Sequence, residues 1–159
     1  MKITFITVGR LKEKYFSAAI EEYSKRLGKY AAFEIIEVPD EKAPENLSPA
    51  EEDIIRQKEG QKILKSIKSG GYVIATAING KQLDSESLSR FMAKLGVDGI
   101  SHIYFIIGGS LGLSGEVLER ADYLLSFSPM TFPHQLMRVM LAEQVYRGFK
   151  IMNGEPYHK

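Results

Sequence analysis

Hydrophobic and polar positions follow two periods that alternate along the chain. Short runs rich in β-branched and aromatic residues predict strands over residues 2–8, 33–38, 72–78, 102–107 and 123–127. Between these runs, apolar residues recur every three or four positions, which predicts helices over residues 13–27, 48–68, 84–95, 116–120 and 135–152. Strands that alternate with helices are typical of a mainly parallel sheet.

Local signals mark where these elements begin and end. Ser48-Pro49-Ala50-Glu51 is a capping box with proline at the first helical position, which is a specific helix start. Gly28 ends the first helix and Gly70-Gly71 ends the second. Asn79-Gly80 predicts a turn directly after the third strand.

We therefore expect an α/β fold of one domain, residues 1–159, in which helices cover both faces of a mainly parallel sheet. In such sheets, ligands bind beyond the carboxyl ends of the strands. Three segments rich in glycine, proline or hydroxyl residues follow predicted strands: residues 79–80, 108–115 and 128–133. Glycine lets a ligand approach the backbone and proline preforms a loop, so these segments together indicate a binding site.

The helix predicted over residues 135–152 has apolar residues on more than one face. One stripe is expected to pack on the sheet, and the remainder needs a second partner. A symmetric homodimer is the simplest source of that partner. The alternative is a helix enclosed within one subunit, which a chain of 159 residues has little material to provide.

Composition narrows the function classes. There are no cysteines, so disulfides, thiol nucleophiles and cysteine-ligated zinc are excluded. No apolar run approaches the roughly 20 residues that span a bilayer, and the N-terminus has no signal-peptide pattern, so we expect a cytoplasmic protein with no membrane association.

The formal net charge of +1 gives no global attraction to nucleic acid. Two local basic groups are candidates for RNA contact: Arg10, Lys12 and Lys14, and Arg138, Arg147, Lys150 and Lys159.

A serine hydrolase is one hypothesis for the glycine-rich segment. Gly108-x-Ser110-x-Gly112 matches the nucleophile elbow of α/β hydrolases and follows a strand. Asp122 and either His134 or His158 follow in the matching order. Against this hypothesis, the chain is short for that fold and lacks an upstream oxyanion loop of the His-Gly-Gly-Gly type.

The start of the last helix carries a second set of chemically capable residues. His134 follows Pro133 at a helix N-terminus, where the helix dipole disfavours a cation and keeps the imidazole neutral. Arg138 is one turn further on and projects on the same side. This position favours a substrate-facing role for Arg138 over Arg147, and no metal-ligand pattern accompanies these residues.

Three C-terminal stretches carry a resemblance to a known family: Phe127-Ser-Pro-Met-Thr-Phe-Pro-His-Gln135, Arg138 with Glu143-Gln-Val-Tyr-Arg147, and Gly154-Glu-Pro-Tyr-His-Lys159. They resemble the bacterial SPOUT-class methyltransferases that modify N3 of pseudouridine in large-subunit ribosomal RNA. The resemblance covers the whole chain. It implies an α/β fold whose C-terminal part is threaded through a trefoil knot, and a homodimer.

The same resemblance implies that S-adenosyl-L-methionine binds in the knot as the methyl donor. The matching positions are Thr76 at the end of the third strand, Gly108 in the glycine-rich segment, and Phe127, Ser128, Pro129, Met130, Thr131 and Phe132. Relatives more often carry leucine where Thr76 stands, so a backbone contact is expected there. Ile107, Leu113 and Phe132 are expected to flank the adenine ring.

The implied reaction is methyl transfer to a pseudouridine of 23S rRNA. The nearly neutral net charge suits a substrate that is recognised by its shape within an assembled ribosome. A base near the target would accept the N3 proton, with His158 as the first candidate and His134 as the second. Arg138 would stabilise negative charge on the base carbonyls, and Tyr157 would stack on or hydrogen-bond to the target base. A non-catalytic protein that binds the ribosome is the remaining alternative.

Overall fold

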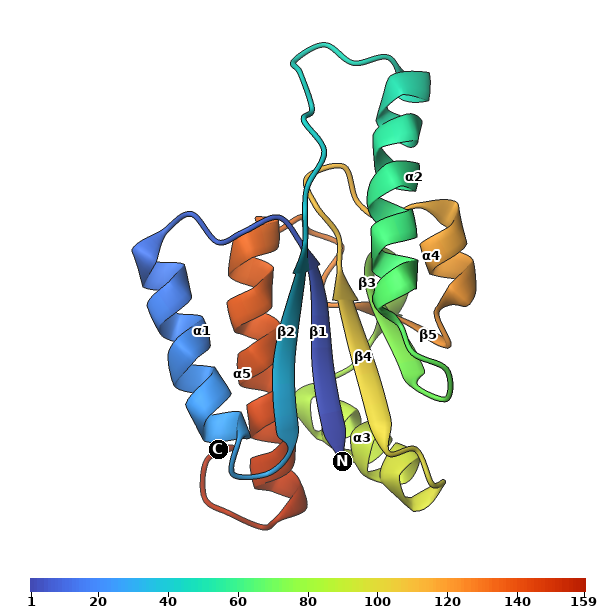
Figure 1. Ribbon diagram of the computed structural model, residues 1–159. Coiled ribbons are helices and arrows are strands. Elements are labelled where there is room, and N and C mark those ends of the chain that lie inside the picture. Colours follow the sequence, from blue (N-terminus) through green and yellow to red (C-terminus); the bar gives the residue numbers. More distant parts are fainter.

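Five parallel strands form one sheet in the computed structural model, which describes residues 1–159 (Figure 1). The strand order is β2-β1-β4-β3-β5, and every neighbouring pair is parallel. The strands are β1 (Lys2–Val8), β2 (Ala32–Val38), β3 (Tyr72–Gln82), β4 (His102–Ile107) and β5 (Tyr123–Ser126). The predicted α/β class and the parallel sheet are confirmed.

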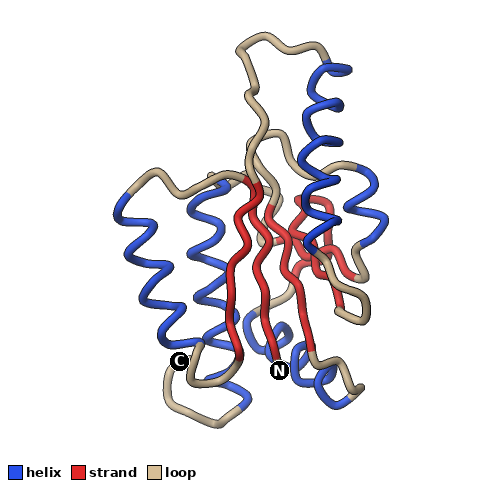
Figure 2. The backbone as a smooth tube through the Cα atoms, viewed as in Figure 1, coloured by secondary structure: helices blue, strands red, loops and turns tan.

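Helices cover both faces of this sheet, as predicted (Figure 2). One face carries α1 (Lys14–Leu27), α3 (Ser85–Val97) and α5 (His134–Met152), with α5 between the other two. The opposite face carries α2 (Pro49–Ser66) and α4 (Gly115–Arg120). Each face has its own apolar core, the first centred on Phe5, Phe105 and Leu141 and the second on Ile6, Ile63 and Ile106.

The predicted capping box is present at the start of α2. The Ser48 hydroxyl accepts a hydrogen bond from the Glu51 backbone N–H at 3.2 Å, and the Glu51 carboxylate accepts one from the Ser48 N–H at 2.7 Å. These two bonds satisfy N–H groups that the first turn of a helix leaves free.

The turn predicted at Asn79-Gly80 is wrong, because β3 continues through both residues to Gln82. Thr76 and Lys81 both pair with Leu125 of β5, so the intervening residues form an irregularity within the strand. Gly80 passes so close to β5 that a Cβ atom would lie 2.6 Å from the Leu124 carbonyl oxygen. Pairing with β5 therefore outweighs the local preference of Asn-Gly for a turn.

The carboxyl ends of the strands and the C-terminus of the chain lie at opposite ends of the molecule. The carboxyl ends of the strands and the beginnings of α1 and α5 lie at one end, whereas the chain terminates beside the other end of α1 (Figure 1). No helix is long and apolar enough to cross a membrane. The knot and the homodimer stay predictions.

Candidate functional site

A cavity of about 650 Å³ lies beyond the carboxyl ends of β3, β4 and β5. Its walls come from residues 76–78 within β3, from the glycine-rich loop after β4 and from the loop between β5 and α5. All the predicted cofactor positions line this cavity except Pro129, namely Thr76, Gly108, Phe127, Ser128, Met130, Thr131 and Phe132. The structure thus brings together residues that are more than 50 positions apart, because parallel strands end at one edge.

The glycine-rich loop packs tightly behind the cavity. A Cβ atom on Gly108 would lie 3.0 Å from the backbone of Gly112, which itself has a φ of +83°. Behind the loop is Glu59 of α2, a carboxyl group that is only 5% exposed and accepts a hydrogen bond from the Glu41 N–H at 3.1 Å. Burial raises the pKa of Glu59.

The shape of the loop requires glycine at two positions. Gly108 approaches the Gly112 backbone too closely for a side chain, and Gly112 has a positive φ.

The loop between β5 and α5 is held by its own hydroxyl groups. The Ser126 hydroxyl donates to the Ser128 carbonyl oxygen at 3.2 Å, and the Ser128 hydroxyl accepts from the Met130 N–H at 3.0 Å. The Met130 side chain is 71% exposed at the rim of the cavity. Pro133 then leads into α5.

Thr76 lines the cavity where β3 runs beside β4. Its hydroxyl donates to the Ile106 carbonyl oxygen of β4 at 3.0 Å. The side-chain hydroxyl is thus engaged within the sheet. The backbone contact expected at Thr76 stays a prediction.

His134 lies at the cavity wall as the first residue of α5. Burial lowers the pKa of its imidazole, the neighbouring Arg138 and Lys12 lower it further, and Asp40 partly opposes them. The imidazole is therefore neutral at pH 7 and can accept a proton. This is the protonation state that the sequence predicted.

Arg138 does not line the cavity, contrary to the expected substrate-facing position. Its side chain is about 1% exposed. The guanidinium donates to the carbonyl oxygens of Val8 at 2.6 Å and Gly9 at 2.9 Å, and to the Glu37 carboxylate at 3.0 Å. Burial lowers the pKa of Arg138 and Glu37 opposes this effect. In a single chain, Arg138 ties the end of β1 to α5.

The C-terminal tail folds back onto α5 rather than fraying. The Tyr157 hydroxyl donates to the Glu143 carboxylate at 3.2 Å, and the Arg147 guanidinium lies 4.7 Å from the centre of the Tyr157 ring. The His158 ring lies 3.3 Å from Arg147 and 3.8 Å from Glu86. Burial, followed by the Glu143 charge, raises the pKa of Tyr157 to about 12.

This docked tail is far from His134 within one chain. His134 and Arg147 are thirteen positions apart in α5, which corresponds to about 20 Å along the helix. The predicted catalytic residues therefore fall into two groups, His134 at the cavity and Tyr157 with His158 further along α5. Neither group includes the buried Arg138.

The serine hydrolase hypothesis finds no triad in the structure. Ser110 and His134 both line the cavity, but Asp122 lies at the opposite end of the sheet. There the Asp122 carboxylate accepts a hydrogen bond from the Val73 N–H at 2.8 Å and pairs with Arg120 at 3.3 Å. Without an acid to orient a histidine, the Gly108-x-Ser110-x-Gly112 sequence serves as a wall of the cavity.

Some cavity residues were not predicted, including Ile78, Leu125 and Met137. Met137 follows His134 by three positions and so shares its helix face, which is a signal that the sequence contained. Ile78 was missed because the binding segment was expected at residues 79–80, whereas the strand itself lines the cavity. No group of three or more His, Cys, Asp or Glu side chains is placed to hold a metal ion.

Comparison with known proteins gives one consistent result. A family described as "Predicted SPOUT methyltransferase" matches residues 1–158. Proteins named "Ribosomal RNA large subunit methyltransferase H" from Alkaliphilus oremlandii, Clostridium kluyveri and Enterococcus faecalis are 64%, 61% and 59% identical, each over the full length of both chains. A probable methylase family protein from Haemophilus influenzae superposes with a TM-score of 0.52 at 14% identity, over 99% of this chain and 70% of that one, which concerns the fold alone.

Proposed function

The chain belongs to the SPOUT methyltransferase family, and on that premise we propose that it transfers a methyl group from S-adenosylmethionine to N3 of a pseudouridine in 23S rRNA. The observation that carries this proposal is the full-length identity of 64% to a protein named as a large-subunit ribosomal RNA methyltransferase. The finer elements, which are the donor and the target atom, rest on the chemistry of the cavity and on the motifs of the sequence.

The cavity suits a nucleoside-sized methyl donor. Its volume of about 650 Å³ falls within the range of small-molecule sites. Gly108, Gly109 and Gly112 expose backbone that can read an adenine edge, while Leu113 and Phe132 offer apolar faces to the ring. When bound, S-adenosylmethionine would supply an activated methyl group on a sulfonium.

The protein's task in such a reaction is alignment and removal of one proton. The bond from N3 to the methyl carbon forms as the carbon–sulfur bond breaks, and the N3 proton must pass to a base. His134 is the neutral imidazole that lies at the cavity of the same chain. Arg138 acts as a positioning residue, because it fixes the first turns of α5 against β1.

The tail can take part only if it reaches another cavity. A base must lie within hydrogen-bond distance of its proton, and about 20 Å of helix separate His134 from the site where the tail is docked. A second copy of the chain, packed against α5, would bring its Tyr157 and His158 to this cavity. We therefore place the tail in the partner's site, and the predicted homodimer follows from the same requirement.

One transfer experiment tests this function. The protein is incubated with S-adenosylmethionine labelled in the methyl group and with ribosomes from a strain that lacks this gene, and the nucleosides of the 23S rRNA are separated. Label in N3-methylpseudouridine is the expected result. Label in another nucleoside would overturn the target, and saturable binding of the donor without any transfer would indicate the non-catalytic alternative.

A further inference from the structure

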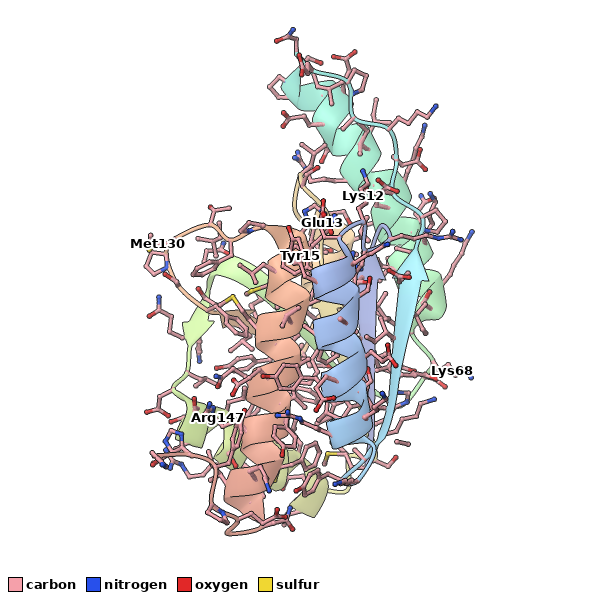
Figure 3. All side chains as sticks on the ribbon, turned by 90° about the vertical axis from the view of Figure 1, so that its left-hand side faces the viewer. Lys12, Glu13, Tyr15, Lys68, Met130 and Arg147 are labelled. Atoms are coloured by element: carbon pink, nitrogen blue, oxygen red, sulfur yellow. The ribbon has the colours of Figure 1, made fainter.

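One exposed segment beside the cavity carries three cations and a tyrosine whose side chains take no part in the apolar cores of the fold. It comprises residues 10–15, between β1 and the first turn of α1, and is called here the basic segment. Arg10, Lys12, Glu13, Lys14 and Tyr15 are all exposed, Tyr15 at 65%. Figure 3 shows Lys12, Glu13 and Tyr15 together at the same end of the molecule as Met130, a residue at the cavity rim.

The cations of the basic segment are free of ion pairs. No carboxylate lies within 4.0 Å of the charged groups of Arg10, Lys12 or Lys14. The second basic group that the sequence suggested differs in this respect, because Arg138, Arg147 and Lys150 pair with Glu37, Glu143 and Glu155. Three cations and one carboxylate, that of Glu13, leave residues 10–15 with a formal charge of +2, and none of the three cations is held in an ion pair.

The backbone of the basic segment is fixed next to the candidate active site. The Lys12 N–H donates to the Gln135 side chain and the Leu11 N–H to the Glu37 carboxylate, both at 3.3 Å. Gln135 directly follows His134, whose pKa is lowered in part by Lys12. A ligand held by this segment would therefore lie beside the mouth of the cavity.

Charge at the start of α1 adds to the positive potential. The helices α2, α3 and α4 each begin with a side-chain cap and at least one acidic residue in the first turn. Neither α1 nor α5 has such a cap or an acidic residue in its first turn, and α1 begins with Lys14 directly after Glu13 at the N-cap position. A lysine at that position is unfavourable for the helix dipole, so Lys14 adds a positive charge to an end of the helix that is already positive.

The aromatic member of the segment is held in a defined orientation. The Tyr15 ring meets the Phe16 ring edge to face, with centroids 4.6 Å apart. Phe16 is partly buried and supports Tyr15, which leaves the phenol ring open to solvent. On the β2 side the segment is bounded by the exposed carboxylate of Asp40, which lies against Gly9 and would repel phosphates.

We propose that the basic segment binds the RNA substrate, with Arg10, Lys12 and Lys14 contacting phosphates and the Tyr15 ring stacking on an unpaired base. Cations combined with an exposed aromatic ring are the common means of holding single-stranded RNA. The target base would then reach the cavity from the α1 side, away from Asp40. This inference rests on the proposed function, because it names the surface by which that substrate is held.

Two readouts test the surface. The variant Arg10→Ala/Lys12→Ala/Lys14→Ala should raise the KM for ribosomes about tenfold or more and reduce the salt dependence of binding by about one unit of log–log slope for each lost phosphate contact. Its affinity for S-adenosylmethionine should not change. Tyr15→Ala should raise the same KM several-fold, whereas Tyr15→Phe should retain the wild-type value because the ring remains.

The control is Lys65→Ala/Lys68→Ala, which removes two exposed, unpaired cations at the end of α2 and just after it. Figure 3 shows Lys68 away from Lys12 and Tyr15. The control should leave KM and the salt slope unchanged. An equal effect of the control and the triple variant would overturn the proposal, as would a triple variant with wild-type KM and slope.

A direct binding measurement separates this proposal from the proposed function. Fluorescence anisotropy with a labelled oligouridylate of twelve nucleotides, at low salt, reports RNA binding without any transfer. If the wild type methylates no ribosomal RNA, the proposed function fails, yet weaker oligouridylate binding by the triple variant and by Tyr15→Ala, but not by the control, would still support the surface. Equal oligouridylate binding by all variants would refute it.

Discussion

The guanidinium of Arg138 donates a hydrogen bond to the carbonyl oxygen of Gly9 at 2.9 Å, across 129 positions of sequence. It also holds the Val8 carbonyl, so one buried side chain joins the end of β1 to α5. These contacts fix the start of α5, where His134 meets the cavity, and the start of the basic segment. Arg138, which was expected to face the substrate, instead fixes these two parts of the site relative to each other.

Replacement of this buried arginine should therefore be costly. Arg138→Met leaves two buried carbonyl oxygens without donors, and we expect the free energy of unfolding to fall by about 3 kcal/mol. Urea denaturation at a fixed protein concentration measures this loss. The control Arg90→Met removes an exposed pair with Glu86 and should cost less than about 1 kcal/mol. Similar losses in the two variants would contradict the positioning role.

His134 should make stability depend on pH. Its folded pKa lies below the unfolded value of about 6.5, so below that value the unfolded chain binds the proton first. Stability is then lost as the pH falls from about 6.5 toward the folded pKa. The variant His134→Asn should show a smaller loss in this window than the wild type. Burial also lowers the pKa of His102, so this residue contributes to the same loss of stability. The loss that remains in His102→Asn therefore reports the contribution of His134.

The Glu143 carboxylate should control the state of the tail. It accepts hydrogen bonds from Tyr157 and from Arg147, and its charge helps to raise the pKa of Tyr157. In Glu143→Gln, the Tyr157 pKa should move down toward its ordinary value of about 10, and methyl transfer should slow while donor affinity is retained. Ultraviolet difference titration against a Tyr157→Phe background identifies the shift. An unchanged titration would show that the docked tail does not depend on Glu143.

Mixing two inactive variants tests whether the tail acts in the partner's site. If the site combines His134 of one chain with His158 of the other, dimers of His134→Gln with His158→Gln contain one intact site. Random pairing then restores about one quarter of the wild-type sites. Co-expression of the two chains, followed by the ribosome transfer assay, measures the recovery. No recovery, with each variant inactive alone, would place the tail in the site of its own chain.

Most of the fold could be predicted because its signals are local. The strand over residues 2–8, the capping box at Ser48 and the helix that follows the proline loop depend on patterns within a few residues. The extension of β3 through Asn79 and Gly80 could not be predicted, because its cause is pairing with Leu125 and Ser126 far along the chain. Local turn preference was the wrong guide there.

The same distinction applies to the site. Two of the three predicted segments, residues 108–115 and 128–133, contribute to the cavity, since the carboxyl ends of parallel strands meet at one edge. The third, residues 79–80, was wrong, because these residues lie within β3 and do not line the cavity.

The burial of Arg138 could not be predicted, because its partners Val8 and Glu37 lie more than 100 positions away. The separation of His158 from His134 could also not be predicted, because helix periodicity does not indicate where a C-terminal tail packs.

The most direct test of the central claim, that the cavity at the ends of β3, β4 and β5 holds the methyl donor during transfer to ribosomal RNA, is single-turnover transfer at increasing S-adenosylmethionine concentration. A Cβ on Gly108 would lie 3.0 Å from the Gly112 backbone, whereas one on Gly115 meets nothing within 4 Å. We predict that Gly108→Ala needs about tenfold more donor for half-maximal transfer and that Gly115→Ala behaves as the wild type. An unchanged donor dependence in Gly108→Ala, or no transfer by the wild type, would contradict the account.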